Sequence, residues 1–298
     1  MRHSSNLIGT FVLLGLAQLT ANFHPEVLRD IDAVLASAVT EKKLPGGVVW
    51  IECEGKSWQK TFGRRNVTGR GEATSEDTIY DTASLTKVLA TAPSILILAE
   101  RGKLKLNAPV VQYIPEFSGG KRQDVTIRQL LTHTSGLRPG ISLRDNWSGR
   151  EGALAKAYQE ELQQMPDRGF KYSDINYILL GEIVRRVSNK PLNEFAAAEI
   201  FKPLKMKDTQ FLPAEKLRQR IAPTEIVGDQ LLRGVVHDPT ARRMGGVAGH
   251  AGIFSTAADI AKFARMILGG GQLESTRILK EESIRLMTSV QSPNALLD

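Results

Sequence analysis

Cysteine is almost absent from this sequence: Cys53 is the single example in 298 residues. One thiol excludes an internal disulfide framework and a zinc site built from several cysteines. We expect Cys53 to be a buried strand residue. Glycine and proline are present at near-average levels, 26 and 13 residues, which excludes collagen-like and low-complexity chains.

Dense blocks of one charge are also missing, although the formal net charge is +7. Basic residues are scattered along the chain, and aromatic residues, 6% of the total, do not alternate with them. A surface that binds nucleic acid through charge and base stacking needs both features. The composition therefore favours a solvated basic surface and predicts no nucleic-acid partner.

Several catalytic and nucleotide-binding motifs do not occur. The chain has no G-x-S-x-G, no G-x-x-x-x-G-K and no G-x-G-x-x-G, and its five histidines have no metal-ligand spacing. These absences argue against a hydrolase nucleophile elbow, a phosphate-binding loop and an H-E-x-x-H metalloprotease. We expect no metal and no cofactor.

The N-terminus has the three-part order of a secretory signal. Arg2 precedes an apolar run at residues 7–19, and the small residue Ala21 follows it. A membrane span needs about 20 apolar residues, so we expect no stable span in the mature chain. The pattern predicts a signal peptide over residues 1–21, a secreted or periplasmic protein, and one folded domain over residues 22–298. The alternative is an uncleaved N-terminal helix.

The order of elements predicts an α+β fold. Apolar residues at helical spacing predict a helix over 27–39, and residues 48–53 and 57–62 predict a hairpin. Because a lone hairpin is marginal, a later strand is needed, and Val235–Val236 is the best candidate. The other predicted helices follow the hairpin. They cover residues 84–100 (kinked at Pro93), 126–132, 151–164, 174–187, 191–201, 256–268 and 280–288.

The pattern S-x-x-K occurs three times, and geometry distinguishes the copies. The copy at 57–60 lies in a predicted strand, where positions three apart point to opposite faces. The copy at 118–121 lies in a glycine-containing loop. Ser84 and Lys87 begin an apolar helix, where positions three apart share a face and free N–H groups can stabilise an oxyanion. Ser84 is therefore the candidate nucleophile; the alternative is a polar first turn with a solvated lysine.

Four segments resemble the penicillin-recognising serine hydrolases, which include class C β-lactamases, D-Ala-D-Ala carboxypeptidases and related esterases. They occur in that family's order and read ASLTKVLAT at 83–91, LLTHTSGL at 130–137, KYSDINYILLG at 171–181 and GHAGIFST at 249–256. The resemblance implies the β-lactamase/transpeptidase-like α+β fold. In that fold an antiparallel sheet is flanked by helices, with an inserted helical region.

The resemblance also implies roles for individual residues. Ser84 would form the acyl-enzyme, Lys87 would hold the Ser84 hydroxyl and shuttle its proton, and Tyr172 would act as general base and then as general acid. Asp174 is the predicted substrate-binding residue, although many members have asparagine there. An ionised carboxylate accepts hydrogen bonds but cannot donate one to a substrate amide. Asp174 could also anchor Lys87 or cap the following helix.

The family's third motif, K-T-G or H-T-G on a C-terminal strand, has no counterpart in this sequence. His250 begins a similar H-A-G triplet, but the family counterpart of this segment is a loop ahead of the third motif. We expect His133 to pack within a loop. We also expect the family's C-terminal strands to be missing, so that the domain is incomplete at its C-terminal end.

Together these features predict a serine hydrolase that acts through an acyl-enzyme on an ester or amide. The substrate would be a peptidoglycan peptide, a β-lactam or a small ester, and the sequence does not fix the oligomeric state. One alternative is a carboxylesterase without β-lactam activity. Another is a non-catalytic or truncated member that only binds cell-wall material.

Overall fold

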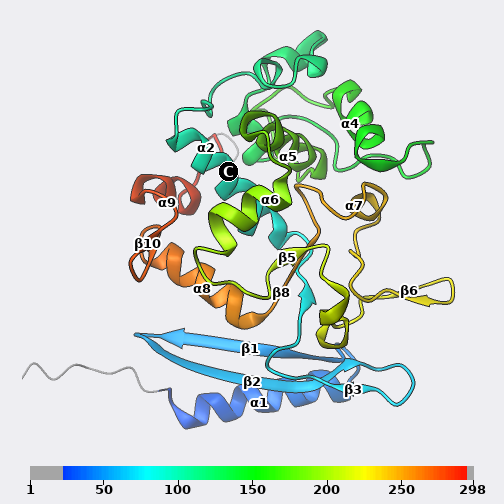
Figure 1. Ribbon diagram of the computed structural model, residues 1–298, viewed down its shortest axis with the longest axis vertical. Helices are drawn as coiled ribbons and strands as arrows, with labels where there is room; N and C mark the ends of the chain where they lie inside the picture. The colour runs from blue at the N-terminus through cyan, green and yellow to red at the C-terminus, as the bar shows by residue number, and fades with distance from the viewer. Residues whose placement is uncertain (1–22, 294–298) are drawn as a thin grey trace, which may run out of the picture.

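The computed structural model describes residues 23–293, so the predicted signal peptide lies outside the described residues. Its N-terminal layer is a hairpin of β1 (Gly46–Cys53) and β2 (Lys56–Asn66), with helix α1 (Pro25–Thr40) on one face. Helix α8 (Ala257–Leu268) packs on β1 from the other side (Figure 1). The predicted first helix and hairpin are confirmed.

Cys53 is exposed, so the prediction that it is a buried strand residue is wrong. It is the last residue of β1 and pairs with Lys56 across the turn. The two turn residues, Glu54 and Gly55, both have positive φ, which suits the tight turns that join paired strands. Residues 52–57, at this end of the hairpin, are all exposed.

A second sheet has the strand order β4 (Tyr80–Asp81), β8 (Ile253–Ser255) and β5 (Gln210–Phe211). Its central strand β8 is fully buried and only three residues long, so it shows no alternation that sequence analysis could detect. The predicted strand at Val235–Val236 is wrong: these residues form no strand. The second sheet matters for function because β4 leads directly into the Ser84 segment.

Helices outnumber strands in the rest of the described chain, as predicted. The apolar segment after Ser84 forms one π-helical turn, η1 (Lys87–Thr91), and continues as α2 (Ala92–Glu100). The π turn stands directly before Pro93, which lacks the N–H that an α-helix would use there. The predicted helix over 151–164 is shorter in the structure, and the one over 191–201 divides into an α and a π part.

The remaining helical elements are η2 (Val110–Gln112), η3 (Pro115–Phe117), η4 (Gly120–Asp124), α3 (Ile127–Leu131), α4 (Gly149–Gln159), α6 (Leu192–Ala196), η5 (Ala197–Phe201), η6 (Glu215–Arg220), α7 (Pro239–Arg243) and α9 (Glu281–Thr288). The remaining strands are short: β3 (Glu72–Ala73), β6 (Ile226–Val227), β7 (Gln230–Leu231), β9 (Gln272–Leu273) and β10 (Thr276–Arg277).

Helix α5 (Asp174–Ser188) is the centre of the core. It contacts α2, α3, α4 and α6, and nine of its residues are buried. The N-terminus of α5 and the start of the Ser84 segment therefore meet inside the molecule. Within residues 23–293, no helix combines the length and apolar character needed to cross a membrane.

Candidate active site

Ser84 lies at the junction between β4 and the first helical turn. Ala83 before it has a φ of 46°, a conformation rare for a residue with a side chain, and the Asp81 carboxylate accepts the Ala83 N–H at 2.8 Å. This turn brings Ser84 to the surface, where it is exposed. Within residues 23–293 the Ser84 N–H makes no hydrogen bond, so it is available to a ligand oxygen.

Lys87 is buried, with 3% of its surface exposed, and its ammonium has three oxygen neighbours. Nζ donates to Ser84 Oγ at 2.9 Å and to the carbonyl oxygen of His250 at 3.1 Å. It also forms an ion pair with Asp174 Oδ1 at 2.8 Å. Two of these oxygens accept hydrogen bonds from Nζ, and the Asp174 carboxylate contributes the opposite charge of an ion pair. The geometry therefore fits a charged Lys87 that is fixed in position.

Tyr172 is brought to Ser84 from 88 residues away. Its hydroxyl donates to Ser84 Oγ at 2.8 Å, and Lys87 Nζ lies 4.6 Å from the centre of its ring. The side chain is partly exposed, so its reactive oxygen can reach solvent or a ligand. The structure therefore brings Ser84, Lys87 and Tyr172 together.

The His133 ring packs against the Tyr172 ring. The two ring centres lie 4.5 Å apart, and His133 Nδ1 accepts the backbone N–H of Ser173 at 3.0 Å. Burial, together with the charge of Lys87, lowers the pKa of His133 to about 4. The imidazole is therefore neutral near pH 7, with its proton on Nε2. The expectation that His133 packs within a loop is confirmed, and the structure adds which residue it packs against.

Asp174 is the first residue of α5, and its carboxylate pairs with Lys87 instead of capping the helix. Ser173 occupies the N-cap position, so the helix-cap interpretation of Asp174 is wrong. Of the roles considered, anchoring Lys87 is the one that the geometry favours. The carboxylate is about one-third exposed, so one side of it still faces solvent.

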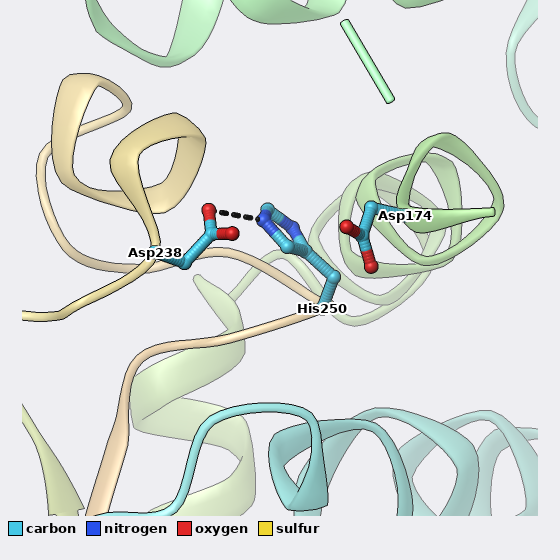
Figure 2. Close-up of side chains that lie close together, drawn as sticks. All are labelled: Asp174, Asp238 and His250. Carbon is cyan, nitrogen blue, oxygen red and sulfur yellow. Dashed lines mark hydrogen bonds and ion pairs between the residues drawn. The ribbon is translucent and has the colours of Figure 1, made fainter. Parts of the chain in front are cut away.

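His250 enters the site through its backbone. Its carbonyl accepts from Lys87, while its side chain is 1% exposed and bonds Asp238 Oδ1 through Nε2 at 2.9 Å. A buried imidazole cannot contact a substrate, which excludes His250 as a stand-in for the third motif. Figure 2 shows the ring between the carboxylates of Asp238 and Asp174. Sequence analysis missed Asp238, because no spacing rule links it to His250.

Comparison with known proteins assigns the chain to a family. The Beta-lactamase family model matches residues 31–296. An Escherichia coli K12 protein, provisionally named a D-alanyl-D-alanine carboxypeptidase, is 31% identical over 73% of this chain. A Bacillus subtilis protein named N-acetylmuramyl-L-alanine amidase is 28% identical over 91% of it. The chain therefore belongs to the beta-lactamase family.

Solved structures show the same fold. An octameric penicillin-binding protein homologue from Pyrococcus abyssi has a TM-score of 0.72 at 26% identity, over 88% of this chain and 60% of its own. A class C beta-lactamase has a TM-score of 0.73 at 19% identity, over 87% of this chain and 68% of its own. The β-lactamase/transpeptidase-like fold is thus confirmed. The chain spans 57% of the E. coli relative and 69% of the B. subtilis one.

Proposed function

We propose that this protein is a serine hydrolase that attacks an ester or amide carbonyl with Ser84 and forms an acyl-enzyme. One observation carries the proposal: Ser84 Oγ is hydrogen-bonded both to Lys87 Nζ, at 2.9 Å, and to the Tyr172 hydroxyl, at 2.8 Å. A serine hydroxyl becomes a useful nucleophile when a neighbouring group can take its proton.

Tyr172 is the proposed proton acceptor. Lys87, as an ammonium, has no lone pair to offer, whereas the Tyr172 oxygen lies 2.8 Å from Ser84 Oγ. In the proposed reaction Tyr172 first releases its own hydroxyl proton to solvent. As Ser84 Oγ then bonds to the carbonyl carbon, the Ser84 proton passes to the Tyr172 oxygen, and the oxyanion accepts a hydrogen bond from the Ser84 N–H. Collapse of the intermediate breaks the bond to the leaving group, which takes the proton from Tyr172. Water then releases the acyl group by the same route.

We propose a peptidoglycan-derived peptide or amide as the substrate, in an exported protein. The E. coli relative is named a D-alanyl-D-alanine carboxypeptidase and the B. subtilis relative an N-acetylmuramyl-L-alanine amidase, and both names support a substrate of this kind. The sequence pattern of a secretory signal over residues 1–21 is consistent with action outside the cytoplasm.

A carboxylesterase is the second candidate, and Asp174 is the observation that favours it. Its carboxylate is occupied by Lys87 and has no N–H to donate to the carbonyl of a substrate amide. An ester substrate does not need that hydrogen bond in order to bind. A small ester would then be turned over without reaction with a β-lactam.

Intact-mass spectrometry after exposure to a fluorophosphonate and to a fluorescent penicillin tests the proposal. We expect one adduct on the wild type and none on Ser84→Ala. The serines of the other two S-x-x-K copies provide matched controls: Ser57→Ala and Ser118→Ala should label like the wild type. A folded wild type that reacts with neither probe, or labelling that persists in Ser84→Ala, would exclude Ser84 as the nucleophile.

The same experiment separates the two candidates. Labelling by the penicillin favours the peptidoglycan-directed enzyme. Hydrolysis of a p-nitrophenyl ester without penicillin labelling favours the carboxylesterase.

A further inference from the structure

The partly exposed Asp238 and the buried His250 form a hydrogen-bonded pair next to the proposed catalytic lysine. The Asp238 carboxylate accepts two hydrogen bonds, from His250 Nε2 at 2.9 Å and from the Ala241 backbone N–H at 2.7 Å. Burial alone would raise the pKa of Asp238, but the His250 hydrogen bond and the other donors outweigh it and lower the pKa. The pair therefore has a carboxylate that is held firmly at the start of α7.

The His250 ring depends on this one partner. Its Nδ1 is buried and makes no hydrogen bond to any residue within 23–293. A buried polar ring without a partner is costly, so Asp238 is the contact that keeps the imidazole in place. Removing the Asp238 carboxylate would leave both ring nitrogens unpaired and favour movement of the ring.

The backbone of the same segment holds the helix that carries Lys87. The carbonyl of His250 accepts from Lys87 Nζ at 3.1 Å, and the carbonyl of Gly249 accepts from Thr91 Oγ1 at 2.7 Å. Gly249 has no room for a side chain, because a Cβ there would lie 1.9 Å from the Tyr177 carbonyl oxygen. The segment is therefore pressed between α5 and the Ser84 helix, with its ring turned to Asp238 and its carbonyl turned to Lys87.

A metal site is the other interpretation of this cluster, since Asp174, Asp238 and His250 offer ligand atoms within 4.8 Å of one another. The arrangement does not favour it. The imidazole lies between the two carboxylates (Figure 2), its Nε2 is already bonded to Asp238, and the Lys87 ammonium is already paired with Asp174. The cation beside this cluster is the ammonium of Lys87, and the cluster forms hydrogen bonds and an ion pair around it.

We propose that Asp238 and His250 are positioning residues that hold the Lys87 ammonium in line with Ser84. A lysine has a long flexible stem, so the direction of its ammonium depends on its acceptors. Two of these, Ser84 and Asp174, are partly or fully open to solvent, whereas the His250 carbonyl belongs to a buried residue. The hydrogen bond between Asp238 and His250 fixes the position of the His250 carbonyl oxygen, which is the third oxygen beside Lys87 Nζ. In its effect on catalysis, this inference rests on the proposed function.

The first test compares Asp238→Ala with Asp238→Asn, which keeps a side-chain oxygen for His250 and Ala241. We expect Asp238→Ala to lower kcat for a p-nitrophenyl ester by at least about tenfold, with KM changed less than about twofold, and Asp238→Asn to recover part of the loss. His237→Gln is the matched control at the adjacent position, because Glu225, at 3.6 Å, is the only polar partner of that ring among residues 23–293. Equal kcat in Asp238→Ala and wild type would overturn the proposal.

A second measurement does not require activity. Reductive methylation with formaldehyde, mapped by peptide mass spectrometry, should spare Lys87 in the wild type while it modifies Lys43, whose side chain is 70% exposed. A thermal unfolding curve first checks that Asp238→Ala is folded. Methylation of Lys87 in this variant should then rise severalfold over the wild type. Unchanged protection would refute the positioning role.

Failure of the proposed function gives a different result. The wild type would then neither hydrolyse the ester nor be labelled at Ser84. The methylation experiment would still decide whether Asp238 and His250 hold Lys87.

Discussion

The same four-residue pattern, S-x-x-K, lies in two regions of the molecule with opposite results. At the start of the α2 segment, Lys87 is buried and bonds Ser84 at 2.9 Å. In the hairpin, Lys60 turns away from Ser57 and pairs with Asp32 of α1 at 3.1 Å, with 45% of its side chain exposed. The comparison shows that spacing places two side chains on one face only in a helix, and that burial then decides whether they interact strongly.

The largest expected difference between substitutions of Lys87 and Lys60 is in the rate at which Ser84 is acylated. Lys87→Met, which keeps the apolar stem and removes the charge, should lower the rate of labelling by a fluorophosphonate by about 10⁴-fold, because proton transfer from Ser84 loses its electrostatic support. Lys60→Met should leave the rate unchanged and alter the free energy of unfolding by less than about 1 kcal/mol, since exposed ion pairs contribute little. Similar labelling rates for the two variants would refute the distinction.

A smaller loss is expected from Tyr172→Phe, which removes only the hydroxyl that contacts Ser84. Labelling should slow by about 10³-fold. Because this side chain is partly exposed, urea unfolding should change little. Tyr113→Phe is the control, since that hydroxyl serves only as an acceptor for the Lys105 N–H. If the Tyr172→Phe enzyme labels as fast as the control, the proton acceptor is another group.

The third prediction concerns stability and pH. The pKa of His133 in the folded chain is lowered to about 4 from its usual value of 6.5. Between these two values the unfolded chain binds a proton that the folded chain does not, so stability falls as pH falls through this window. The full contribution is about 3 kcal/mol.

Urea unfolding at pH 7 and at pH 4 measures this effect. The stability of His133→Gln should decrease less than that of the wild type over the interval. His24→Gln, which removes an exposed imidazole from the hairpin layer, is the matched control. The same decrease for wild type and His133→Gln would show that His133 does not contribute.

Local sequence pattern predicted the elements that it controls directly. Helical stretches in the sequence predicted α1, α5 and α8, and two strand-like runs with a turn signal between them predicted the β1–β2 hairpin. Local pattern failed for β8, which is too short and too buried to alternate, and for Cys53, which lies at the exposed end of the hairpin. The role of Asp174 also depended on what lay opposite it, because a carboxylate at a helix start can cap or pair.

The sequence by itself determined that Ser84 and Lys87 share one face of a helix, since helical geometry fixes positions three apart. Only the tertiary structure decided that Tyr172 reaches Ser84, that Asp174 pairs with Lys87, and that Asp238 bonds the buried His250 ring next to them. These contacts join residues 12 to 88 positions apart. Their geometry is set by how α5, β8 and the Ser84 segment pack, which no local pattern encodes.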